Sequence, residues 1–76
     1  MRERIKKVMK DNFKLKDIPD NISQKNCSVW DSLHHLQLVV GLETEFNISI
    51  EPEDIAEMQS IEDIEKVINN YCFYNG

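Results

Sequence analysis

Apolar residues recur at helical spacing in three separate segments of the chain, and this pattern predicts three main helices. Within each segment they lie three or four residues apart, so that they share one helix face and leave polar residues on the other. The helices are predicted over residues 2–14, 32–46 and 60–72. Their expected core faces consist of Ile5, Val8, Met9 and Phe13 in the first, Leu33, Leu36, Val39, Val40, Leu42 and Phe46 in the second, and Ile61, Ile64, Val67, Ile68 and Tyr71 in the third.

A fourth, short helix is predicted over residues 52–57. Pro52 stands at its first position with acidic residues around it, which is where a helix start favours both. Ser60 and Asp63 have the spacing of a capping box and mark the start of the last helix. Residues 47–50 alternate like a short strand, but one strand cannot form a sheet, so we expect a structured loop there.

Residues 15–30 have no helical period and predict a long loop. Pro19, followed by Asp20 and Asn21, is a turn signal, because proline disfavours a helical residue before it and Asp and Asn suit turns. A loop of this length in a small domain is usually functional or held by its own apolar side chains. The candidates for holding it are Leu15, Ile18, Ile22, Val29 and Trp30.

Two local features qualify this pattern. Gly41 lies in the middle of the second helix, where it costs roughly 1 kcal/mol relative to alanine. Such a glycine indicates the close approach of another helix.

The last residues, 73–76, are expected to fray.

These elements together predict an all-α single domain over residues 1–76, a small four-helix bundle of three main helices and one short helix. A chain of 76 residues has little room for a deep pocket, which favours a function performed at the surface over most enzymatic functions. The composition, 41% hydrophobic and 30% charged, is typical of a soluble globular domain.

The chain has no apolar run approaching the roughly 20 residues of a membrane span. Its charged amino terminus is not followed by the apolar stretch of a signal peptide, so the cytoplasm is the expected compartment. A monomer is the expected state. Cys27 and Cys72 lie outside any metal-binding or CxxC spacing, and two free thiols are expected.

The net charge of −5 conceals a strong asymmetry along the chain. Residues 1–16 carry seven basic and two acidic residues, whereas residues 17–76 carry two basic and twelve acidic residues. The acidic majority opposes binding to nucleic acid, whose phosphates need basic neutralisation, and leaves only the first helix to support a DNA-binding hypothesis. It favours partners with basic surfaces, although such charges also simply keep a small protein soluble.

The start of the second helix is the strongest candidate site. Either Asp31 or Ser32 can cap the free backbone N–H groups of its first turn, and a plain cap is the simplest interpretation of the pair. The amino end of a helix also favours anions, so a phosphodiester on Ser32 would lie in a favourable field. Asp31 is either the cap or a ligand for a magnesium ion brought by a modifying enzyme.

The run from Trp30 to Phe46, WDSLHHLQLVVGLETEF, resembles the signature of the acyl carrier protein family. That signature is an Asp-Ser-Leu followed by an apolar-patterned helix that ends in Leu-Glu-x-Glu-Phe. Residues 48–54 and the last helix from Ser60 are also similar to the family, so the resemblance covers about residues 28–68 in motif detail.

The resemblance implies that the protein is not an enzyme but a carrier. Ser32, next to its motif neighbour Asp31, would receive 4′-phosphopantetheine from coenzyme A through a phosphopantetheinyl transferase. The terminal thiol would then hold acyl groups as thioesters for acyl-loading and acyl-processing enzymes with basic docking surfaces. The residues implied in docking are Leu33, Glu43 and Glu45 on the second helix and Glu53, Asp54 and Glu57 near the short helix. A solvated helix face is the alternative interpretation of each acidic residue.

The chain departs from the commonest fatty-acid carriers at two positions. His34 and Gln37 stand where those carriers usually have acidic residues, which weakens the negative patch beside the serine. Trp30 resembles specialised stand-alone carriers and D-alanyl carriers of cell-wall modification. The resemblance implies a fatty-acid, polyketide-like or other specialised pathway, and these departures lead us to expect a dedicated one.

The adjacent histidines, His34 and His35, are expected to be partly exposed surface residues. They point about 100° apart on a helix, so they form a poor metal pair. If His34 lies beside the arm, its protonation below about pH 6.5 adds positive charge near the phosphate. Trp30 is expected to anchor the loop rather than bind a ligand.

Two further functions compete with the carrier hypothesis. A non-enzymatic helical adaptor shares the fold and the acidic surface but needs no modified serine. A small hydrolase would use Ser32 as nucleophile and a histidine as base. It also needs an orienting acid, an oxyanion site and a cleft, for which the chain offers little room.

Overall fold

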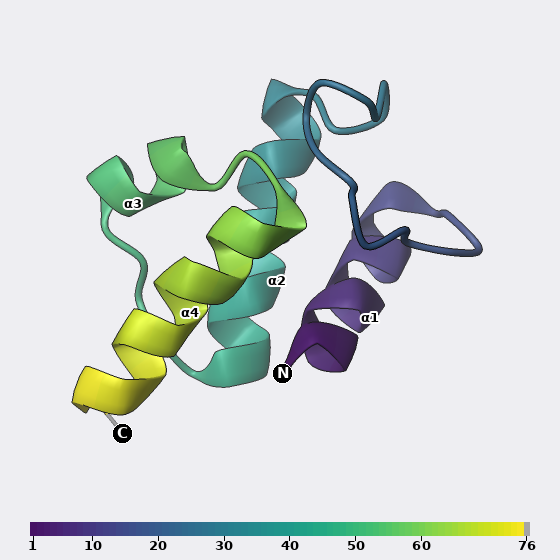
Figure 1. The fold of residues 1–76 in the computed structure, drawn as a ribbon. Helices are drawn as coiled ribbons and strands as arrows, with labels where there is room; N and C mark the ends of the chain where they lie inside the picture. The colour runs from purple at the N-terminus through teal and green to yellow at the C-terminus, as the bar shows by residue number, and fades with distance from the viewer. Residues whose placement is uncertain (76) are drawn as a thin grey trace.

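The computed structural model describes residues 1–75, and the side chains of residues 1–72. Over these residues the chain forms four helices and no β-strand: α1 (Arg2–Phe13), α2 (Ser32–Phe46), α3 (Pro52–Glu57) and α4 (Ile61–Asn75) (Figure 1). The predicted small all-α bundle of three main helices and one short helix is therefore confirmed.

The helix bounds follow the predicted ones closely. Those of α2 and α3 agree, α1 ends one residue earlier, and α4 begins one residue later than predicted. The backbone of α4 continues to Asn75 and does not end at residue 72. Gly76, the last residue of the tail expected to fray, lies outside the described residues, as do the side chains of residues 73–75.

The helices α1 and α2 run side by side in opposite directions, with α4 packed across them and α3 beside the first half of α2 (Figure 1). The loop of residues 15–30 connects α1 to α2 at the end of the bundle where α2 begins, opposite the end at which both termini lie. No helix of residues 1–75 has the length and apolarity needed to cross a membrane.

The core is apolar throughout the described residues. The expected faces of α1 and α4 are buried, except that Tyr71 is only partly covered. The buried side chains are Ile5, Val8, Met9, Phe13, Ile18, Ile22, Trp30, Leu38, Val39, Leu42, Ile50, Met58, Ile61, Ile64, Val67 and Ile68.

Half of the six apolar residues that predicted the core face of α2 are exposed and not buried, including Leu33, which the resemblance also implied as a partner contact. Leu33, Leu36 and Val40 are 62%, 57% and 61% exposed. Apolar residues surround α2 almost completely between positions 33 and 42, whereas α1, α3 and α4 cover only part of its circumference. Some of these residues must therefore face water. Phe46 is half-buried, with the Arg4 guanidinium 4.3 Å from its ring centre.

Gly41 confirms the expected close approach of a second helix. A Cβ atom at this position would lie 2.8 Å from Cγ1 of Val8 and 3.0 Å from Nδ2 of Asn12, both on α1. Real Cβ atoms do not sit 2.8 Å from another carbon. Only glycine therefore allows the backbone of α2 to pack this closely against α1.

The long loop is held to the bundle by apolar side chains, as predicted. Ile18, Ile22 and Trp30 are buried, and Leu15 and Val29 pack against the core. Backbone bonds add to this attachment: Ile61 N–H donates to the carbonyl of Ile22 at 3.2 Å, and Gln24 N–H donates to that of Gln59 at 2.9 Å. Next to them the Ser60 hydroxyl caps α4 by accepting from the N–H of Asp63 at 3.1 Å, which confirms this half of the capping box.

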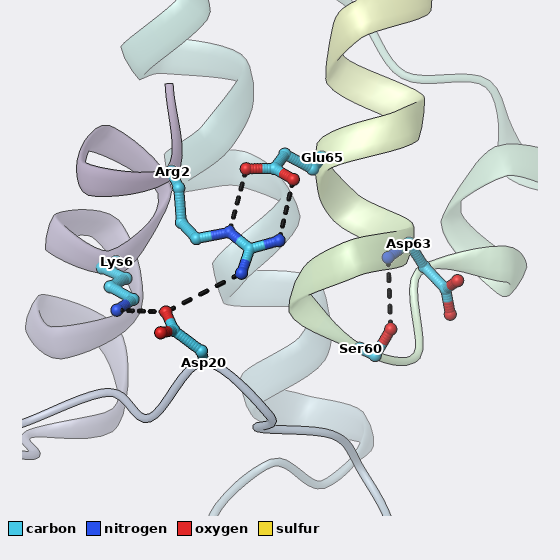
Figure 2. A network of polar contacts seen from close by, with 6 residues as sticks. All are labelled: Arg2, Lys6, Asp20, Ser60, Asp63 and Glu65. Carbon is cyan, nitrogen blue, oxygen red and sulfur yellow. Dashed lines mark hydrogen bonds and ion pairs between the residues drawn. The ribbon is translucent and has the colours of Figure 1, made fainter.

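Ion pairs join the basic α1 to acidic residues elsewhere in the bundle (Figure 2). The Arg2 guanidinium donates to both carboxylate oxygens of Glu65 on α4, at 2.9 and 2.8 Å. It also lies 3.7 Å from Asp20 of the loop, whose carboxylate is 2.6 Å from the Lys6 ammonium. These bonds hold the pKa of Glu65 and the pKa of Asp20 below their ordinary values. Some basic residues of the first segment thus pair with acidic residues of the later segments within the folded protein.

Candidate functional site

Ser32 is the first residue of α2, and it is exposed. The cap of the helix is its neighbour Asp31, whose extended backbone (φ −95°, ψ −174°) places the carboxylate under the first turn. There Oδ1 of Asp31 accepts from the N–H of His34 at 2.9 Å. Since Asp31 performs the capping, the hydroxyl of Ser32 is not needed for it and faces solvent at the positive end of the helix dipole.

Asp31 and His34 form a second contact through their side chains. Nδ1 of His34 lies 2.8 Å from Oδ1 of Asp31. The backbone N–H of His34, and then its imidazole, lower the pKa of Asp31 below its ordinary value. The carboxylate at the head of α2 therefore stays charged.

The arrangement of these residues does not resemble a hydrolase triad. Asp31 and His34 have the acid–imidazole contact of such a triad, but the nucleophile would have to be Ser32. Residues two apart on a helix do not face each other, so the Ser32 hydroxyl and the His34 ring point to different sides of α2. The ring of His34 packs instead edge-on against Phe13 of α1, with 6.2 Å between the ring centres.

His35 connects three segments of the structure, a role that its expected surface position did not predict. Its Nδ1 accepts from the indole N–H of Trp30 at 2.9 Å, and its Nε2 lies 2.9 Å from the carbonyl of Ile55 on α3. An indole only donates and a carbonyl only accepts, so these partners assign a neutral ring with the proton on Nε2. The ring also stacks on Trp30. The expected partial exposure of both histidines is confirmed.

No signal in the sequence pointed to this connection. Trp30 lies five residues before His35, and Ile55 lies twenty residues after it. The acceptor on α3 is a backbone carbonyl, which any residue type supplies. The expected role of Trp30 is confirmed, because its indole is only 3% exposed and packs on Phe13 with 5.6 Å between ring centres.

An uncharged surface extends along α2 from the candidate serine. The exposed apolar residues Leu33, Leu36 and Val40 recur at helical spacing, and no charged residue occurs from position 32 to position 42. Gln37 and Thr44 complete the exposed side. We call Leu33, Leu36, Gln37, Val40 and Thr44 the apolar face. Grouped apolar exposure of this kind marks interaction surfaces on soluble proteins.

The acidic residues expected to contact partners differ in how free they are. Oε2 of Glu43 accepts from the N–H of Ile50 at 2.8 Å, and Glu45 accepts from Nε of Arg4 at 2.9 Å, a bond that lowers the pKa of Glu45. Both carboxylates therefore serve the fold.

The expected acidic contacts on α3 differ in whether they are bonded within the fold. Asp54 accepts from the hydroxyl of Tyr71 at 2.7 Å, whereas Glu53 and Glu57 are exposed. These last two side chains make no hydrogen bond or ion pair to other side chains among residues 1–72, whose side chains the structure describes. The expected acidic contacts that make no bond to the described residues thus lie on α3.

No group of three or more His, Cys, Asp or Glu side chains within the described residues has the arrangement of a metal site. Cys27 and Cys72 are both free thiols and half-buried, as expected. In a comparison with protein-family models, no model matches the chain.

Proposed function

We propose that this protein is a carrier whose Ser32 bears a 4′-phosphopantetheine arm. The terminal thiol of the arm holds an acyl group as a thioester and presents it to the enzymes of a fatty-acid, polyketide-like or other specialised pathway. The observation that carries the proposal is the division of roles at the head of α2: Asp31 caps the helix, and the exposed Ser32 hydroxyl has no role in the cap. The resemblance of the run from Trp30 to Phe46 supports the same serine.

The attachment chemistry suits this position. The Ser32 oxygen attacks the phosphorus of coenzyme A that bears the pantetheine. A P–O bond to the serine forms, the P–O–P bridge breaks, adenosine 3′,5′-bisphosphate leaves, and the hydroxyl proton passes to a base of the transferase. The new phosphodiester carries one negative charge at the amino end of a fifteen-residue helix, where the dipole and free N–H groups favour an anion. The attached state therefore needs no basic side chain from this protein.

Partner enzymes would bind mainly to the apolar face. Leu33, the apolar contact implied by the family resemblance, is one of its most exposed residues. Glu43, Glu45 and Asp54 are bonded within the fold, whereas Glu53 and Glu57 beside this face are exposed and make no side-chain bond within residues 1–72. A partner that fits has an apolar groove for α2 and basic groups on the α3 side, with fewer charge pairs than the sequence alone implied.

The attachment is tested by incubating the folded protein with coenzyme A and a broad-specificity phosphopantetheinyl transferase and then measuring the intact mass. We expect one arm per chain. Ser32→Ala should gain none, whereas Ser28→Ala, a matched change of an exposed loop serine, should gain one. If the unmutated protein gains no mass, the carrier proposal is wrong.

A helical adaptor that binds partners and carries nothing is the second candidate, because the apolar face alone is sufficient for it. D-alanyl or peptidyl carriers of cell-wall or secondary metabolism remain variants of the first. The adaptor predicts that partner binding survives Ser32→Ala unchanged and that protein isolated from its own cells has the unmodified mass. A carrier predicts the arm in that isolated protein.

A further inference from the structure

The side of α2 that bears Ser32 continues directly into the core. Ser32, His35 and Val39 follow one another at helical spacing and share one side of the helix. Ser32 is exposed, His35 is half-buried, and Val39 is buried. The contact between His35 and Ile55 shows that this side faces α3. The shortest path for an acyl chain from Ser32 to the core therefore runs between α2 and α3, past His35 and Val39.

His35 closes that path. Its ring is bonded on one edge to the indole of Trp30 and on the other to the carbonyl of Ile55. The ring thus spans from the loop before α2 to α3. Trp30 is itself fixed in the core against Phe13, so one end of this connection is rigid.

Opening the path would break both bonds. The indole N–H of Trp30 would lose its acceptor in a largely buried position, and the carbonyl of Ile55 would keep only the bond from the N–H of Met58, at 3.3 Å. An unpaired donor that is removed from water is costly, and an entering alkyl chain cannot replace either bond of His35. The chain would thus have to displace a hydrogen-bonded ring and not merely separate apolar surfaces.

We infer that His35 keeps the contact between α2 and α3 closed, so that the cargo of the Ser32 arm stays outside the bundle and is a short or polar acyl group. This inference rests on the carrier function proposed above. A long alkyl chain loses most when it is held in water, because the penalty grows with every methylene group left exposed. A short or polar acyl group needs no burial and suits a carrier with a closed core.

The inference is tested by loading the arm with an acetyl or an octanoyl group and comparing side-chain methyl NMR signals of the core, those of Val39, Met58 and Ile64. Intact mass first confirms that each arm and acyl group is present. In the unmutated protein we expect the two loaded forms to have the same core signals. In His35→Ala the octanoyl form should differ from the acetyl form, whereas the neighbouring control His34→Ala should behave like the unmutated protein.

The possible outcomes separate the two proposals. If no arm is added, the intact mass shows it and the carrier function fails before any cargo is compared. If the arm is added and the octanoyl group shifts the core signals of the unmutated protein, the carrier function stands and the closed core is wrong. If the core signals of a folded His35→Ala also ignore chain length, His35 is not what keeps the cargo out. The comparison within the unmutated protein decides the cargo question even if His35→Ala does not fold.

Discussion

At the scale of single residues, neighbouring side chains around the start of α2 have separate tasks. Asp31 caps the helix and binds the ring of His34, His35 joins the loop to α3, and Ser32 between them is left exposed. A serine that capped its own helix would lose that bond on modification. Here the cap is independent of the hydroxyl, so an arm can be attached without loosening the helix that presents it.

Gly41 provides a test of the packing at residue scale. Gly41→Ala gains roughly 1 kcal/mol of helix propensity. It also forces a methyl group against the buried, stiff Val8, and overpacking of this kind costs about 1–3 kcal/mol. We expect a net loss of about 1 kcal/mol in the free energy of unfolding, measured by urea denaturation.

The control for this prediction is Gln37→Ala, one turn earlier on the exposed side of α2. It should leave stability within about 0.5 kcal/mol of the unmutated protein. The double variant Gly41→Ala with Val8→Ala should show coupling, because the second change removes the obstructing methyl groups. A more stable Gly41→Ala protein would mean that α1 and α2 do not approach as closely as described.

At the scale of elements, the sequence predicts where helices lie better than which side each one buries. In α1 and α4 the apolar residues form a single stripe, so period and burial agree. In α2 they surround the helix, and the period cannot distinguish Leu38, which is buried, from Leu36, which is exposed. That distinction depends on which neighbouring helices cover α2, and neighbours are set by contacts between distant segments of the chain.

The candidate site shows the same limit. Ser32 is a candidate from the sequence because its signals are local: an acidic residue, a serine and a helix start in a row, within a run that resembles a family signature. The bond from His35 to Ile55 and the bond from Glu43 to Ile50 join residues that the sequence does not relate. The sequence predicted a docking role for Glu43 because it does not show that the N–H of Ile50, in the loop before α3, donates to this carboxylate.

The ion pairs that join α1 to α4 predict a pH dependence of stability. The pKa of Glu65 is lowered from its ordinary 4.5, first of all by its bonds to Arg2. A carboxyl group with a lowered pKa in the folded state stabilises the fold above its ordinary pKa, and this contribution is lost as the pH falls below it. Glu65→Gln should therefore lower the melting temperature at neutral pH, and the difference should shrink below about pH 4.5.

Glu62→Gln is the matched control, because Glu62 is an exposed acidic residue near the start of the same helix. It should change the melting temperature less than Glu65→Gln at neutral pH. A difference between Glu65→Gln and the unmutated protein that persists undiminished to about pH 3 would show that the charge of Glu65 is not what stabilises the contact.

At the scale of the whole molecule, the paired charges of α1 and the exposed apolar residues of α2 lie on different parts of the described surface. The basic residues Arg2, Arg4 and Lys6 of α1 are paired with acidic residues elsewhere in the bundle. The apolar face of α2 has no charged side chain, and the neighbouring α3 is acidic. A partner that reaches Ser32, as the carrier proposal requires, would therefore meet apolar side chains first and a few carboxylates at the margin.

This arrangement predicts how binding to a partner enzyme responds to mutation. Leu36→Ser should weaken binding about tenfold, the loss typical of an apolar side chain truncated inside an interface. Glu57→Gln, the matched change of an exposed acidic residue on α3, should have a smaller effect. For the unmutated protein, the affinity for the partner, measured by calorimetry, should differ little between low and high salt, because salt screens few charge pairs at this interface. A larger effect of Glu57→Gln, with strong weakening by salt, would show that docking is mainly electrostatic.

The most direct test of the carrier function locates the modification on the chain. The protein is incubated with coenzyme A and the transferase, its intact mass is measured, and the peptides obtained by proteolysis are then sequenced by tandem mass spectrometry. We predict a single 4′-phosphopantetheine, which the fragment ions place on Ser32 and not on Ser23, Ser28, Ser49 or Ser60. An unmodified protein, or an arm found on any other residue, would contradict the assignment of Ser32 as the attachment point.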